Sequence, residues 1–208
     1  MARYSKRSEK EQGGSTTIRI NVVDGVTFFQ NLITNPPKLD RKGAGKMLRY
    51  LEEKVRQTTG MSLEEYLKRS LEEERDPKEK AFTKMVLKMY QSLSEYLDFI
   101  RKYADPDEIE NITVGSDLFF KKMLNKEFTI LDVLRQDLGV CGTWVYAIID
   151  VDGERYLFSD PERIYFITTT GEKGKSLGLQ LTNILKEYKL PLKATVVRKG
   201  QYFKWVIR

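Results

Sequence analysis

From Gly142 the spacing of the apolar residues changes from helical to strand-like, and that change constrains the fold more than any other feature. Between residues 43 and 104, apolar residues recur every three or four positions, which is the spacing of one face of a helix. In residues 142–208 they alternate with polar residues, which is the spacing of a strand with one buried face. The sequence therefore predicts an α+β protein, in which a helical N-terminal and middle region precedes a mainly antiparallel β-sheet domain.

Three helices are expected in the first part. Residues 43–58 are amphipathic, Ser62 and Glu65 make a capping box that opens a second helix, and Asp76-Pro77 opens a third. The third is the longest, and its apolar residues follow alternating steps of four and three: Phe82, Val86, Met89, Leu93, Tyr96, Ile100 and Tyr103, with a second row at Met85, Tyr90 and Leu97. This wide stripe suits a bundle within the chain or between subunits, so residues 77–104 are a candidate oligomerisation helix.

These patterns divide the chain into three regions. Residues 1–15 are basic and poor in apolar side chains, and we expect a disordered tail there. Residues 16–140 are expected to be mostly helical, with one strand at 17–23 and short helices at 26–33, 116–124 and 129–138. Residues 141–208 form the predicted sheet domain. The sequence leaves open whether the strand at 17–23 joins that sheet.

Within the sheet domain, turn residues mark the strand ends. Asp152-Gly153 predicts a type I′ turn between two strands, and a further strand (RIYFITTT) precedes a backing helix at 177–188. The chain ends in a hairpin, KATVVRKGQYFKWVIR. In its last strand, alternation assigns one set of side chains to the core (Phe203, Trp205, Ile207) and the other set to the opposite face (Tyr202, Lys204, Val206, Arg208).

The composition excludes several kinds of chemistry. The 208 residues include no histidine and one cysteine, Cys141, which excludes an intramolecular disulfide, a Cys/His zinc site and a histidine-activated nucleophile. We expect no catalytic activity and no cofactor. No signal peptide or long apolar run is recognisable, so a cytoplasmic protein without membrane contact is expected. Charged residues make up 32% of the chain and are dominated by Lys and Glu, which is typical of a thermophile.

The net charge of +6 is unevenly distributed. Residues 1–60 hold 12 basic and 6 acidic residues, residues 61–140 hold 13 and 17, and residues 141–208 hold 11 and 7. Both ends are therefore basic around an acidic middle, and the basic ends are candidate surfaces for a polyanion.

Two stretches resemble catalytic motifs in part. GEKGKS at 171–176 lies between a strand and a helix, but Thr169 stands where a Walker A motif needs its first glycine. What remains is a loop whose free amides, with Lys173 and Lys175, can hold one phosphate. Asp150, Asp152 and Glu154 cluster at a hairpin tip and can in principle bind Mg²⁺ for phosphodiester hydrolysis.

Aromatic and basic residues also occur together on the predicted strands. Bases of single strands stack on aromatic rings while cations follow the phosphates, so a sheet that offers both suits single-stranded nucleic acid. The candidate nucleic-acid-binding residues are Trp144, Tyr146, Arg155, Arg163, Tyr165, Lys173, Lys175, Arg198, Lys199, Tyr202, Lys204 and Arg208.

A heptad-bearing helix (FTKMVLKMYQSLSEYLDFIRKY) combined with a basic, aromatic-rich sheet domain ending VVRKGQYFKWVIR resembles the ThermoDBP family of single-stranded-DNA-binding proteins from archaeal thermophiles. The resemblance is one of architecture and composition over most of the chain, without a diagnostic motif. It implies binding of single strands in a basic cleft with an apolar floor, and assembly through helices. It assigns no site residue.

The sequence therefore predicts a non-catalytic protein that binds single-stranded DNA or RNA by electrostatic capture and aromatic stacking, and that forms a homo-oligomer. A Mg²⁺-dependent nuclease is the first alternative. A helical adaptor that binds another protein is the second.

Overall fold

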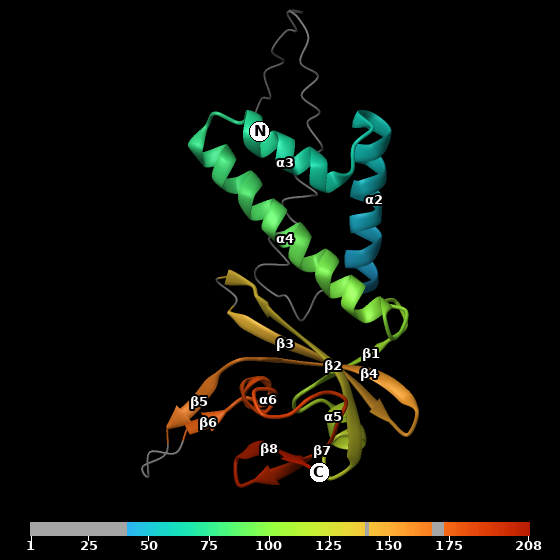
Figure 1. Ribbon diagram of the computed structural model, residues 1–208, viewed down its shortest axis with the longest axis vertical. Helices are drawn as coiled ribbons and strands as arrows, with labels where there is room; N and C mark the ends of the chain where they lie inside the picture. The colour runs from blue at the N-terminus through green and yellow to red at the C-terminus, as the bar shows by residue number, and fades with distance from the viewer. Residues whose placement is uncertain (1–40, 140–141, 168–172) are drawn as a thin grey trace, which may run out of the picture.

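The computed structural model describes residues 41–139, 142–167 and 173–208 of the chain. Of the helices in the described residues, three lie at one end of the molecule, and a curled sheet with the other two lies at the other end (Figure 1). In chain order the elements are α2 (Arg41–Thr59), α3 (Leu63–Glu73), α4 (Pro77–Arg101), β1 (Glu110–Thr113), α5 (Asp117–Lys122), β2 (Glu127–Asp137), β3 (Thr143–Val151), β4 (Glu154–Pro161), β5 (Ile164–Ile167), β6 (Lys173–Lys175), α6 (Leu177–Ile184), β7 (Leu192–Lys199) and β8 (Tyr202–Ile207). The predicted tail at 1–15, strand at 17–23 and helix at 26–33 lie outside the described residues, as does Cys141.

The helix starts agree with the local sequence. The Ser62 side chain accepts a hydrogen bond from the Glu65 amide and the Glu65 carboxylate accepts one from the Ser62 amide, which completes the predicted capping box of α3. Asp76 caps α4 by accepting from the Lys78 amide, and Pro77 occupies the first turn. Both predicted helix starts are confirmed.

The apolar stripe of α4 is used inside the chain. Helix α4 buries Val86, Leu93 and Leu97 in a cluster that α2 and α3 complete through Leu51, Val55, Leu63 and Leu67. The Tyr90 hydroxyl in this cluster donates to Glu52 Oε1 at 2.9 Å. Association between subunits through residues 77–104 stays a prediction, since the packing within the chain already accounts for the buried residues of the stripe.

The sheet has six strands in the order β1-β4-β3-β2-β7-β8. All neighbouring pairs are antiparallel except β1 and β4, so the predicted α+β class with a mainly antiparallel sheet is confirmed. The turn between β3 and β4 has positive φ angles at Asp152 (55°) and Gly153 (85°), as a type I′ turn requires. The pair β5 and β6 forms a separate two-stranded ribbon that projects from the body in Figure 1.

The helix predicted at 129–138 is wrong, because residues 127–137 form strand β2 in the middle of the sheet. Elements pack on both faces of β2, so its apolar residues do not alternate cleanly. The pairing with β3 also shifts register between Ile130 and Asp132, which interrupts the period of two. Together, packing on both faces and the register shift give the apolar residues of β2 a spacing that resembles that of a helix. The sheet therefore already includes β1 and β2, and a boundary at residue 141 cuts through it.

Helices cover both faces of the central strands. On one face Val145, Ala147 and Ile149 of β3 lie in the main core, which includes Phe119 of α5 and Leu181 of α6. On the other face the alternate residues Trp144, Tyr146 and Ile148 pack against the C-terminal end of α4, where Phe99 and Ile100 are buried. Gln136 of β2 strengthens this contact, since its Nε2 donates to Ser92 O and to Glu95 Oε2, each at 2.8 Å.

Candidate nucleic-acid interface

Helix α4 covers only part of its sheet face. The strand register carries this face from β3 across β2 to β7 and β8: Thr129 pairs with Asp150, Glu127 with Thr195, and Thr195 with Val206. The core cluster beneath α4 contains residues of β2, β3 and β4 but none of β7 or β8 among those described. Figure 1 shows α4 and the β7–β8 hairpin at opposite ends of the sheet. We call the remaining surface the open sheet face: Glu127, Thr129, Lys193, Thr195, Val197, Lys199, Tyr202, Lys204, Val206 and Arg208.

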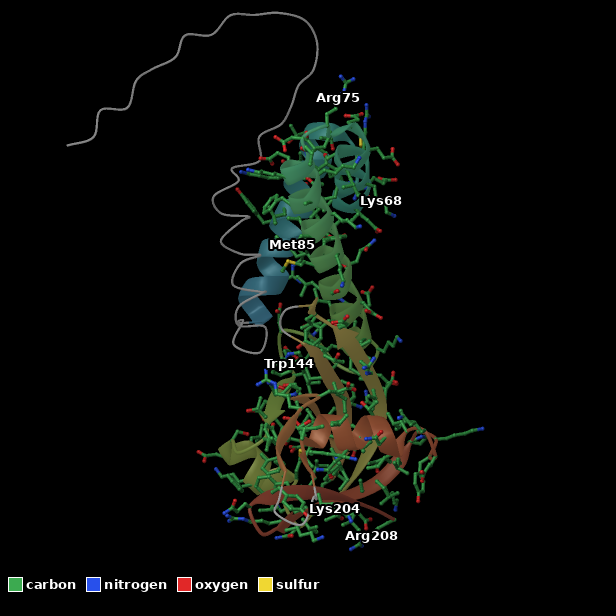
Figure 2. The ribbon with its side chains drawn as sticks, turned by 90° about the vertical axis from the view of Figure 1, so that its left-hand side faces the viewer. Lys68, Arg75, Met85, Trp144, Lys204 and Arg208 are labelled. Atoms are coloured by element: carbon green, nitrogen blue, oxygen red, sulfur yellow. The ribbon has the colours of Figure 1, made fainter. Side chains whose placement is uncertain are left out.

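The open sheet face combines cations with apolar side chains. Four exposed cations lie on it (Lys193, Lys199, Lys204, Arg208). Tyr202 lies opposite Lys199, and Lys204 lies opposite Val197. Val206 is 39% exposed, so apolar surface separates the charges. In Figure 2 the labelled Lys204 and Arg208 lie at the end of the molecule remote from Lys68 and Arg75 of the helices. On the other side of the last strand, Trp205 is buried and Phe203 and Ile207 pack against the core, so the predicted alternation of this strand is confirmed.

One carboxylate neutralises part of this charge. Arg208 Nη1 donates to Glu127 Oε2 at 2.8 Å, and Lys193 Nζ lies 3.8 Å from Glu127 Oε1. All three side chains remain substantially exposed, so the pairing is in contact with water. The positive charge of the open sheet face is therefore partly neutralised at the end where Glu127 lies, and it is larger towards the β7–β8 hairpin tip, where Lys199 and Lys204 lie.

A buried hydroxyl lies in the centre of the face. Thr195 is 6% exposed, and its Oγ1 has no hydrogen-bond partner among the described residues. An unpaired buried hydroxyl costs about 1–3 kcal/mol, so such a group needs an explanation.

Two predicted stacking residues are not accessible to a base in this structure. Trp144 and Tyr146 are each 8% exposed beneath α4, and the Tyr146 ring makes an edge contact with Tyr96 at 4.8 Å between centroids. The strand before the Asp152-Gly153 turn was predicted correctly, but the sequence does not reveal that a helix covers this part of the sheet face.

The remaining predicted residues lie elsewhere. Arg155 is at the other end of the sheet, where Nη1 donates to Tyr103 O at 2.6 Å and the guanidinium lies 5.9 Å from the Tyr103 ring centroid.

Arg163 precedes the β5–β6 ribbon, which carries Tyr165 (56% exposed) and Lys175. Lys173 belongs to the same ribbon, and its side chain lies outside the described part. Arg198 points away from the open sheet face by strand alternation, and its Nε donates to Gly200 O at 3.2 Å. The structure thus joins Lys199, Tyr202, Lys204 and Arg208 of the predicted set.

At the start of α6, amides that were expected to be free for a phosphate already have partners. Ser176 Oγ accepts from the Leu179 amide at 3.1 Å, and Asp160 Oδ2 accepts from the Gly178 amide at 2.8 Å. Burial raises the pKa of Asp160 to about 6, against the opposing effect of these amide hydrogen bonds. The Asp160 carboxyl therefore occupies the position at the Gly178 amide that a phosphate would take.

Two of the three acidic residues of the alternative nuclease site are also engaged. Asp150 Oδ1 accepts from the Gly153 amide at 3.0 Å within the turn. Glu154 Oε2 accepts from Lys122 Nζ at 2.7 Å and from the Tyr156 hydroxyl, and the hydrogen bond from Lys122 is the main cause that lowers the pKa of Glu154. The described residues contain no group of three or more His, Cys, Asp or Glu that can hold a metal ion.

Sequence reasoning missed Glu127, Lys193 and Thr195. Lys193 and Thr195 alternate within KATVVR as Lys204 and Val206 do in the next strand, so strand alternation alone was a sufficient signal for them. Glu127 had no such signal, since the segment that follows it was predicted to be helical.

No protein-family model, curated protein or solved structure matches this chain. The resemblance to the ThermoDBP family therefore stays a prediction. None of the described helices is both long and apolar enough to cross a membrane.

Proposed function

We propose that this protein binds single-stranded nucleic acid on the open sheet face, without catalysis. The observation that carries the proposal is the half of a sheet face that α4 leaves uncovered among the described residues, on which four cations, a tyrosine ring and exposed valine surface lie together. Elsewhere on the same face, α4 covers the aromatic residues.

The arrangement suits a flexible polyanion with exposed bases. Lys193 and Lys199 lie six residues apart on one strand, which is about 20 Å, and Lys204 and Arg208 are about 13 Å apart on the next. Cations over this distance can follow several consecutive phosphates. Tyr202 offers a ring for one base, and stacking on aromatic side chains contributes about 1–3 kcal/mol per base. Bases in a duplex are already stacked on one another, so the surface favours single strands.

A double variant tests the proposal directly. Tyr202→Ala/Lys204→Ala removes one ring and one cation from the open sheet face, and we expect the affinity for a labelled oligonucleotide at low salt to fall at least tenfold. The matched control is Tyr50→Ala/Lys54→Ala on α2, where an exposed tyrosine also lies beside a lysine, 4.7 Å from Nζ to ring centroid. The control removes the same groups from the helical end and should bind normally.

The measurement is fluorescence anisotropy with single-stranded and duplex DNA and RNA of equal length, over a range of salt concentrations. Absence of binding to any of these probes at low salt overturns the proposal, as does equal binding by the two double variants. Mg²⁺-dependent degradation of the probe that Asp150→Ala abolishes would instead establish the nuclease alternative.

A further inference from the structure

We infer that Glu127 is an internal competitor for nucleic-acid phosphates: in the free protein it pairs with Lys193 and Arg208, and a bound strand replaces it. The inference rests on the proposed function and assigns a role to one carboxylate of the open sheet face. We call Glu127, Lys193 and Arg208 the Glu127 cluster.

The geometry of the cluster favours such an exchange. Glu127 begins β2, Lys193 lies near the start of β7, and Arg208 follows the last residue of β8, so three strands bring the side chains together. Each of the two oxygens of Glu127 faces one cation, Oε2 at 2.8 Å from Arg208 and Oε1 at 3.8 Å from Lys193. Exposed ion pairs of this kind contribute little free energy, so a phosphate in contact with the same cations can displace the carboxylate.

The position of Thr195 supports the same conclusion. It pairs with Glu127 on one side and Val206 on the other, so it lies directly beside the cluster. Its hydroxyl is buried and lacks a hydrogen-bond partner among the residues that the structure describes. A phosphate oxygen that replaces the Glu127 carboxylate brings an acceptor to this hydroxyl once the side chains around it rearrange. Binding therefore changes two groups of the free protein. The two cations exchange the Glu127 carboxylate for a phosphate, and the unpaired hydroxyl gains an acceptor.

The consequence is that loss of the Glu127 charge should strengthen binding. In Glu127→Gln both cations become available to phosphates, while the amide oxygen can still accept a hydrogen bond from Arg208. We expect three- to tenfold tighter binding of a single-stranded oligonucleotide at low salt. The plot of log affinity against log salt should steepen by roughly 0.7–1.4, which corresponds to one or two additional phosphate contacts on a single strand.

The matched control is Glu110→Gln. Glu110 is an exposed glutamate that begins β1, as Glu127 begins β2, but β1 is the opposite edge of the sheet. Both variants raise the net charge by one, so a general electrostatic effect changes them equally and an effect of the Glu127 cluster appears only in Glu127→Gln.

The experiment titrates a labelled oligonucleotide into the full chain and both variants, and repeats Glu127→Gln in a Lys193→Ala/Arg208→Ala background. Tighter binding by Glu127→Gln alone, lost in that background, supports the inference. If the wild type binds and the two Gln variants behave alike, the inference is wrong and the proposed function stands. If neither the wild type nor the Gln variants bind, the proposed function fails, and the inference with it.

Discussion

The covered and open parts of the sheet carry similar residue types with opposite consequences. On β3, Trp144 and Tyr146 alternate with core residues, and on β8, Tyr202 and Lys204 do the same. Both pairs occupy the same face of one sheet. Under α4 the aromatic side chains are buried, and they stabilise the contact between the helices and the sheet. On the open sheet face Tyr202 is only partly buried. Burial, and not residue type, therefore separates a structural aromatic from a candidate binding residue.

The largest difference is expected from the two tyrosines. Tyr146→Ala leaves a cavity beneath α4 and removes the contact with Tyr96, so the free energy of unfolding should fall by about 3–5 kcal/mol. Tyr202→Ala should change it by less than about 1 kcal/mol, because surface substitutions away from the core have small effects. Chemical denaturation monitored by fluorescence measures both. Similar losses in the two variants would contradict the division of the sheet face.

The buried carboxyl of Asp160 beneath α6 provides a second contrast, in how the stability of the fold depends on pH. Burial raises the pKa of Asp160 to about 6 in the folded chain, whereas the ordinary value is 3.8. The folded state therefore binds the proton more tightly than the unfolded state. The stabilisation by the protonated form is fully present below about pH 4 and is lost as the pH rises through about 6. Its size is about 3 kcal/mol from the pKa difference.

Asp160→Asn should remove this pH dependence, so the difference in unfolding free energy between wild type and variant should change by that amount from pH 4 to pH 7. Asp152→Asn, in the exposed β3–β4 turn, is the control for the loss of one negative charge. A profile for Asp160→Asn parallel to the wild type would show that burial does not raise this pKa.

Glycine substitutions compare the packing of α6 with that of the open hairpin. A Cβ on Gly178 would lie 2.6 Å from the backbone oxygen of Asp160, so Gly178→Ala must separate α6 from β4. We expect a loss of about 1–3 kcal/mol, although alanine favours a helix. At Gly200 a Cβ meets nothing within 4 Å, and only the φ of 62° opposes a side chain, so Gly200→Ala should cost about 1 kcal/mol. Thermal denaturation ranks the two variants, and the reverse order would contradict the close contact.

The smallest effect is expected at Thr195 and has the opposite sign. Thr195→Val removes the unpaired hydroxyl and nearly preserves the shape of the side chain, so the free protein should gain about 1 kcal/mol of stability. If the hydroxyl contacts a phosphate in the complex, the same variant should bind an oligonucleotide several-fold more weakly. A destabilised variant would mean that the hydroxyl has a partner in the folded protein.

Much of the local structure could be predicted from sequence. Ser62 with Glu65, Asp76 with Pro77, and Asp152 with Gly153 each set a helix start or a turn through side chains at most three residues apart. The two sides of β8 followed from alternation in the same way, and they placed Tyr202, Lys204 and Arg208 on one face. These features depend on neighbours along the chain, so the sequence contains the information that decides them.

The tertiary structure alone decided the rest. The sequence of β2 has helical spacing because two layers pack on it and its register shifts, and neither cause is visible within the segment itself. Trp144 and Tyr146 are buried because α4, some fifty residues earlier, lies on their part of the sheet, and the amides of α6 are occupied because Asp160 of β4 reaches them. The sequence by itself determined the α+β class, the caps, the turns and the alternation of the final hairpin, since local sterics and hydrogen bonds govern them. Which half of the sheet face stays open was decided by contacts between distant segments.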